Sequence, residues 1–77
     1  MYDREQRREN LRELRKNISQ NLQQLRQEMG LSLEELSEQC HVPLSRLSRF
    51  EIGLDSDVAD LNLLAAFYGK KIRVEFY

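Results

Sequence analysis

The stretch SLEELSEQCHVPLSRLSRFEIG, residues 32–53, decides how this chain folds. It opens with a capping box. Ser32 can accept a hydrogen bond from an orphan backbone amide, while Glu35, three residues on, reaches back to the serine. Apolar residues then recur at spacings of three and four, at Leu33, Leu36 and Cys40. This spacing predicts a short helix with one apolar face.

A second helix is expected after a short turn. Proline has no amide hydrogen and fits best at the first position of a helix, so Pro43 marks its start, and Gly53 ends it. Leu47 and Phe50 share its apolar face. Its other faces carry Ser45, Arg46, Ser48 and Arg49. Two short helices joined by a tight turn can leave the second exposed, and an exposed helix with these side chains suits the major groove of DNA.

The segment before this unit, residues 3–29, has a helical apolar stripe. The stripe consists of Leu11, Leu14, Ile18, Leu22, Leu25 and Met29. Asp3 with Gln6, and Asn17 with Gln20, both have capping-box spacing. The segment is therefore either one long helix or two helices broken near Asn17.

The segment after the unit is expected to hold one more helix and a strand. Residues 58–68 are typical of a helix, with Gly69 as its C-cap. In the tail KKIRVEFY the apolar Ile72, Val74 and Phe76 alternate with polar residues, which predicts a β-strand. A lone strand has no partner within the chain. We therefore expect it to pair with the same strand of a second copy across a two-fold axis.

With these elements in this order, residues 18–72 resemble the lambda-repressor-like (Cro/Xre) helix-turn-helix family. The matching landmarks are Ile18, Leu22, Leu25-Arg26, Gly30-Leu31-Ser32, Glu34-Glu35-Leu36, Val42, Leu47-Ser48-Arg49, Glu51-x-Gly53, Leu61, Leu64-Ala65 and Gly69. The closing helix and strand resemble the HipB-like branch of this family. The resemblance implies a mainly α fold, a four- to five-helix lambda-repressor-like DNA-binding domain. An N-terminal helical extension would span residues 1–16, and the domain residues 17–77, with its dimerisation strand at residues 71–77.

The family resemblance also assigns roles to individual residues. DNA contacts are expected from Ser32, Pro43, Leu44, Ser45, Arg46, Ser48 and Arg49. Leu44 would contact a thymine methyl group or pack on the domain. Arg26 and Glu51 would form a structural ion pair, and Ile72, Val74 and Phe76 would form the dimer contact. In the alternative interpretation, Arg46 and Arg49 belong to a solvated helix face.

Three positions depart from the family pattern. Leu33 stands where a glutamine usually helps to hold phosphate, so that contact is lost. His41 stands where the turn usually has a glycine, and histidine is among the better-tolerated residues in a left-handed conformation. Pro43 replaces the usual serine or threonine.

Composition narrows the function further. Seventy-seven residues make one small domain, for which dimerisation is a common source of stability. A single cysteine excludes an internal disulfide and a cysteine-based zinc cage. We find no metal-ligand cluster, phosphate loop or nucleophile–base pair, so we expect no enzyme activity, no cofactor and no metal. The chain has no apolar run of transmembrane length and no signal peptide, which indicates a cytoplasmic protein without a membrane partner.

The net charge of −1 is not that of a general nucleic-acid-binding protein, so DNA binding would need a local basic face. Residues 1–18 carry six basic and four acidic side chains. This segment is a salt-bridged exposed helix, an arm for the DNA backbone, or a helix that docks a partner.

The sequence thus predicts a homodimeric repressor-type transcription factor bound to double-stranded DNA. Its two recognition helices would lie about 34 Å apart on a pseudo-palindromic operator. The alternative is a protein-binding module. It would be either the antitoxin of a toxin–antitoxin pair or an adaptor that has lost operator recognition, with a toxin or other regulator as partner.

Overall fold

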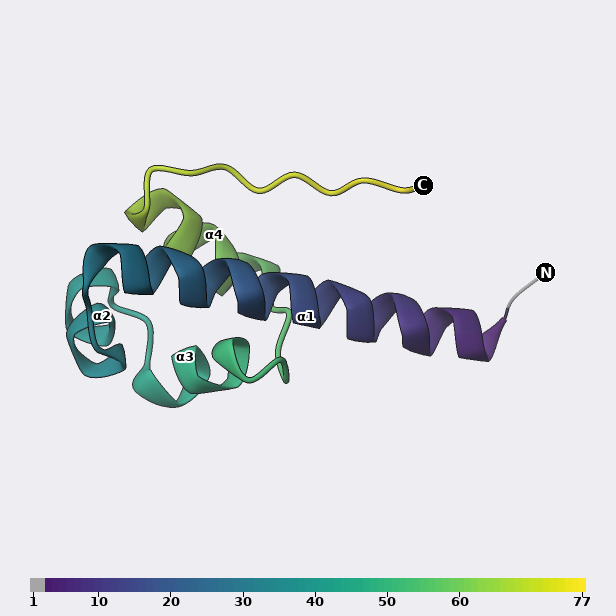
Figure 1. Ribbon diagram of the computed structural model, residues 1–77, viewed down its shortest axis with the longest axis horizontal. Helices are drawn as coiled ribbons and strands as arrows, with labels where there is room; N and C mark the ends of the chain where they lie inside the picture. The colour runs from purple at the N-terminus through teal and green to yellow at the C-terminus, as the bar shows by residue number, and fades with distance from the viewer. Residues whose placement is uncertain (1–2) are drawn as a thin grey trace.

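Four helices make up the regular structure of the computed structural model, which describes residues 3–77 (Figure 1). They are α1 (Arg4–Met29), α2 (Leu33–Cys40), α3 (Leu44–Glu51) and α4 (Val58–Phe67). The expected mainly α fold is confirmed, with four helices rather than five. The first two residues of the expected extension lie outside the described residues.

The first helix is continuous over 26 residues. The Asp3 carboxylate caps it by accepting from the amides of Glu5 and Gln6 at 3.0 and 3.3 Å. The helix does not break at Asn17, whose backbone and side-chain oxygens both accept from the amide group of Asn21 one turn later. Gly30 ends the helix in a left-handed conformation, with φ 67°. Of the two possibilities left open by the pattern, the single long helix is correct.

The N-terminal part of α1 projects beyond the other helices (Figure 1). The molecule measures 44 Å along its longest axis and about half of that along the other two. Leu11 and Leu14 continue the apolar stripe into this projecting part, where they are 39% and 45% exposed. The apolar stripe of α1 is therefore longer than the core that it covers.

The helix-turn-helix unit forms as its sequence predicts. Ser32 and Glu35 make the reciprocal capping box at the start of α2, each with a hydrogen bond of 3.1 Å. His41 occupies the left-handed turn position, with φ 62°. The Ser37 hydroxyl donates to the carbonyl of Val42 at 2.7 Å and closes the turn. Pro43 is the N-cap of α3, so the helix begins at Leu44, one residue later than expected.

The core lies where α2, α3 and α4 meet beneath α1. The fully buried apolar side chains are Leu36, Cys40, Val42, Leu47, Phe50 and Leu64. Phe50 is the largest of them and has no exposed surface. Leu33, which replaces the family's glutamine, packs against this cluster. The exposed side of α3 is thus presented by a helix whose other side is anchored in the core.

The segment after α4 corrects the expected strand. Residues 70–77 have no regular secondary structure among the described residues, although the trace in Figure 1 is extended. A strand is defined by its hydrogen-bonded partner, and no segment within residues 3–77 pairs with this one. The residues expected to form the dimer contact, Ile72, Val74 and Phe76, are 45%, 68% and 97% exposed. The tail therefore runs alongside α1 with much of its apolar surface uncovered.

Candidate nucleic-acid interface

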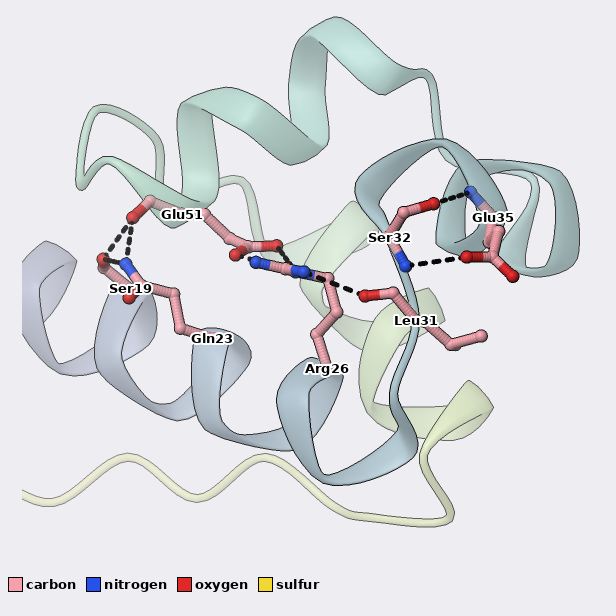
Figure 2. A network of polar contacts seen from close by, with 7 residues as sticks. All are labelled: Ser19, Gln23, Arg26, Leu31, Ser32, Glu35 and Glu51. Carbon is pink, nitrogen blue, oxygen red and sulfur yellow. Dashed lines mark hydrogen bonds and ion pairs between the residues drawn. The ribbon is translucent and has the colours of Figure 1, made fainter.

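An ion pair between α1 and α3 anchors the end of the candidate recognition helix (Figure 2). Arg26 Nε lies 2.8 and 3.0 Å from the two carboxylate oxygens of Glu51, and its Nη1 donates to the carbonyl of Leu31 at 2.9 Å. The hydrogen bond to Glu51 raises the pKa of Arg26 above its usual value, against the opposing effect of burial. Glu51 is only 8% exposed. Removing either partner would leave the other charge poorly compensated.

Two further side chains of α1 bind the backbone of the same residue. The hydroxyl of Ser19 and the amide of Gln23 each donate to the carbonyl oxygen of Glu51 at 2.6 Å (Figure 2). They satisfy a carbonyl at the end of α3 that no helical amide can reach. Sequence reasoning missed both contacts, and only the helical spacing of Ser19, Gln23 and Arg26 could have suggested them. Together these contacts fix the position of α3 against α1.

The outer side of α3 is open to solvent at its first turn. Pro43, Leu44 and Ser45 are exposed, and Leu44 is 40% exposed rather than packed in the core. Ser48 is half-buried one turn later. Ser32 is half-buried at the start of α2, where its hydroxyl is engaged by the capping box.

The two arginines of α3 are held by acidic side chains from the following segment. Arg46 Nε lies 2.9 Å from Asp60, and its Nη1 lies 3.6 Å from Asp57. Arg49 Nε lies 3.6 Å from Asp55. None of these acids was expected to contact α3. The acidic loop LDSD, directly after the helix, was the signal that could have found them.

Asp55 is stabilised in its charged form. Burial raises its pKa, but the backbone amides of Asp57 and Ser56 and the nearby Arg46 and Arg49 outweigh that effect, so the net pKa is lowered. This carboxylate therefore remains ionised near neutral pH and continues to attract both arginines.

The helix-turn-helix unit and the loop after it are acidic as a whole. Residues 32–60 contain two basic side chains, Arg46 and Arg49, and seven acidic ones. Both basic side chains are engaged within the chain. Phosphates that approach α3 must therefore compete with carboxylates for these arginines.

A groove lies on another side of the molecule, between α1, α4 and the tail. It encloses about 580 Å³. Its apolar lining comes mainly from Leu14, Ile18, Leu22, Leu61, Ile72 and Val74. The tail spans this space without filling it, and the Tyr77 hydroxyl reaches Glu13 at 3.4 Å.

Other kinds of site find little support. Within residues 3–77, no group of three histidine, cysteine or acidic side chains could hold a metal ion. Cys40 is a buried, unpaired thiol in the core, as expected. None of the helices described in residues 3–77 is long and apolar enough to cross a membrane.

Comparison with known proteins places the unit in a family. A family model described as HTH_3, helix-turn-helix, matches residues 22–74, which is more than half of the chain. The match includes the last part of α1 from Leu22, all of α2, α3 and α4, and the tail as far as Val74. No curated protein and no solved structure matches the chain.

Proposed function

The chain belongs to the helix-turn-helix family HTH_3, a family of DNA-binding domains of the Cro/C1 type, and we propose from this premise that it is a sequence-specific transcriptional regulator. The proposed protein is a homodimer that represses from a pseudo-palindromic operator, with one α3 in the major groove of each half-site. In this proposal Pro43, Leu44 and Ser45 approach base edges at the first turn of α3. Ser32 and Ser48 approach phosphates, and Arg46 and Arg49 contribute the positive charge.

The observation that best supports this proposal is how α3 is held in the fold. Its inner side holds Leu47 and Phe50 in the core, and its end is fixed to α1 by the Arg26–Glu51 pair. Its first turn remains exposed. A rigid helix with one open face is what insertion into a groove requires, because a mobile helix would lose affinity through ordering.

The experiment that tests the function is a selection of random duplex DNA on the purified protein at near-physiological salt. We expect enrichment of an inverted repeat whose half-sites lie about one helical turn apart. Recovery of no motif, with only weak and salt-sensitive binding, would reject sequence-specific recognition.

The second candidate is a protein-binding module, such as an antitoxin or an adaptor. The acidic character of residues 32–60 favours it, because a surface with two engaged arginines and seven acids attracts phosphates weakly. An antitoxin would yield both an operator and a captured toxin. An adaptor would yield a captured protein and no operator.

We assign the dimer contact to the tail. Ile72, Val74 and Phe76 alternate along an extended segment, and the apolar groove beside it is unfilled. Two copies related by a two-fold axis would each offer the same exposed side chains and the same unpaired backbone edge. A two-stranded ribbon between copies would cover both.

Deleting residues 72–77 should weaken dimerisation at least about tenfold, because each buried aliphatic or aromatic side chain stabilises by about 1.5–3 kcal/mol. Sedimentation velocity over a concentration series measures the change. The matched variants are Val74→Asp, on the apolar side of the tail, and Glu75→Ala on its other side. The first should dissociate the dimer, while the second should not. An unchanged dimer after the deletion would place the interface elsewhere.

Removing the acids that hold Arg46 should strengthen DNA binding. Asp57→Asn with Asp60→Asn keeps the shape of both side chains, and asparagine is as good as aspartate at the N-cap of α4. Each exposed ion pair is worth about 0.2–1 kcal/mol, so releasing two should raise affinity about twofold to thirtyfold. Titration of the selected duplex measures this. Unchanged affinity would show that Arg46 takes no part in binding.

A further inference from the structure

A row of arginines runs along the projecting part of α1. Arg4, Arg8, Arg12 and Arg15 follow one another at spacings of four, four and three residues. At about 100° per residue these spacings place them on one side of a helix. Because α1 is continuous from Arg4 to Met29, the arginine row is a fixed feature of a single rod.

The arginine row lies on the side of α1 that contacts α3. Ser19 and Arg26 continue the same side at four and eleven residues beyond Arg15, and both contact Glu51 of α3. Gly53, which follows α3, lies close to the start of this side of α1. A Cβ atom at Gly53 would be 3.9 Å from the backbone oxygen of Arg15. The row therefore begins where α3 ends and continues outward on that side. The tail runs along another side of α1, as Figure 1 shows.

The charges of the row are not neutralised. Among the described residues 3–77, Arg4, Arg8 and Arg12 form no ion pair, and all three are exposed. The acids Glu5, Glu9 and Glu13 form a neighbouring row on α1, with Glu5 and Glu9 three residues before Arg8 and Arg12. Within residues 3–77 they nevertheless form no ion pair with Arg8 or Arg12. This contrasts with α3, where carboxylates engage both arginines.

From this geometry we propose that the arginine row binds the phosphate backbone of the duplex next to the half-site occupied by α3. The inference rests on the proposed function and adds the source of its sequence-independent affinity. The row is about 16 Å long, at 1.5 Å per residue, which matches the rise of about five base pairs. Guanidinium groups bind phosphate oxygens in bidentate geometry, and the helix-turn-helix unit itself is too acidic to supply this attraction.

The arginine row also helps to decide between the three interpretations of residues 1–18, namely a salt-bridged helix, a helix that docks a partner and an arm for the DNA backbone. A salt-bridged helix would pair its arginines with its own acids, which Arg4, Arg8 and Arg12 do not do. A helix that docks a partner protein is expected to use an apolar face, and Leu11 and Leu14 lie to one side of the row rather than within it. The row is instead uniformly cationic, as a polyanion requires.

The test compares two variants of equal charge. Arg8→Gln with Arg12→Gln removes two positive charges from the row and keeps good helix formers. Lys16→Gln with Lys70→Gln, the control variant, removes two positive charges that belong neither to the row nor to the dimer segment at residues 71–77. Binding of each variant and of the wild-type chain is measured on the selected operator and on an unrelated duplex, over a range of salt. Sedimentation checks that both variants keep the oligomeric state of the wild-type chain.

We expect the row variant to lose affinity by the same factor on both duplexes, on the order of tenfold, and the salt slope to fall by about 1.8. The control variant should change neither the affinity nor the salt slope. The proposal for the arginine row would be overturned if both variants bound DNA equally well, or if the row variant lost affinity for the operator alone. A wild-type chain without sequence preference would overturn the proposed function, while the unrelated duplex would still report on the row. A wild-type chain that binds no duplex would overturn both.

Discussion

Phe50→Ala should remove a large part of this domain's stability. Phe50 has no exposed surface and stands at the centre of the contact between α2, α3 and α4. Truncation of a buried phenylalanine typically costs about 3–5 kcal/mol, and a domain of this size is typically stable by about 4–12 kcal/mol. The midpoint of thermal unfolding should fall by roughly 12–40 °C. Circular dichroism at 222 nm during heating measures the change.

The matched control is Leu63→Ala on α4, where the side chain is 50% exposed. It removes an aliphatic group without opening a cavity, so its unfolding midpoint should shift by only a few degrees. Similar midpoints for the two variants would mean that the core does not close around Phe50. In that case α3 would not be the rigid helix on which the proposed function depends.

The helices could be predicted because their signals are local. Ser32 and Glu35 form their capping box within one turn, and His41 occupies the left-handed position at which the family has glycine. Leu47 and Phe50 are buried because their spacing places them on one side of α3. The continuity of α1 was not decidable from the pattern, since Asn17 is compatible both with a new N-cap and with the middle of an exposed helix.

The parts that escaped prediction depend on contacts between distant segments or between chains. Arg46 and Arg49 were chosen as exposed DNA contacts from their position on α3. Their partners are Asp55 in the loop after α3 and Asp60 in α4, and the acidic loop does not specify which arginine each carboxylate contacts. The strand expected at residues 71–77 is absent from the single chain for another reason. Alternation shows that a segment is compatible with a sheet, but hydrogen-bonding partners determine whether it is a strand.

Family membership predicts that this chain binds DNA, whereas the charge of its helix-turn-helix unit predicts only weak attraction to DNA. The match over residues 22–74 identifies a DNA-binding domain, yet the unit that would enter the groove carries more acidic than basic residues. The two observations are compatible if α3 supplies shape and a few specific contacts while α1 supplies most of the phosphate attraction. Binding to unrelated DNA should then come mainly from α1 and depend strongly on salt.

Arg46→Ala with Arg49→Ala should abolish operator recognition. A well-placed bidentate arginine contributes about 1–3 kcal/mol of discrimination between bases, so losing two should weaken operator binding about thirtyfold or more. Binding to unrelated duplex should fall much less, because the arginine row on α1 is intact. Fluorescence anisotropy with the selected operator and a scrambled duplex measures both effects.

Stability separates loss of contact from loss of fold in this variant. Both arginines are partly exposed, at 41% and 55% of their side chains, and their ion pairs lie at the surface, so the unfolding midpoint should change little. A control with Lys16→Ala and Lys70→Ala removes the same charge outside α3 and outside the dimer segment at residues 71–77, and should leave operator binding intact. If the Arg46 and Arg49 variant kept full operator affinity, the arginines would serve only to tie α3 to Asp55, Asp57 and Asp60. The exposed first turn of α3 would then be the sole recognition surface. If the wild-type chain selected no operator, the variant would have no operator affinity to lose. The acidic unit would then be the surface of a protein-binding module.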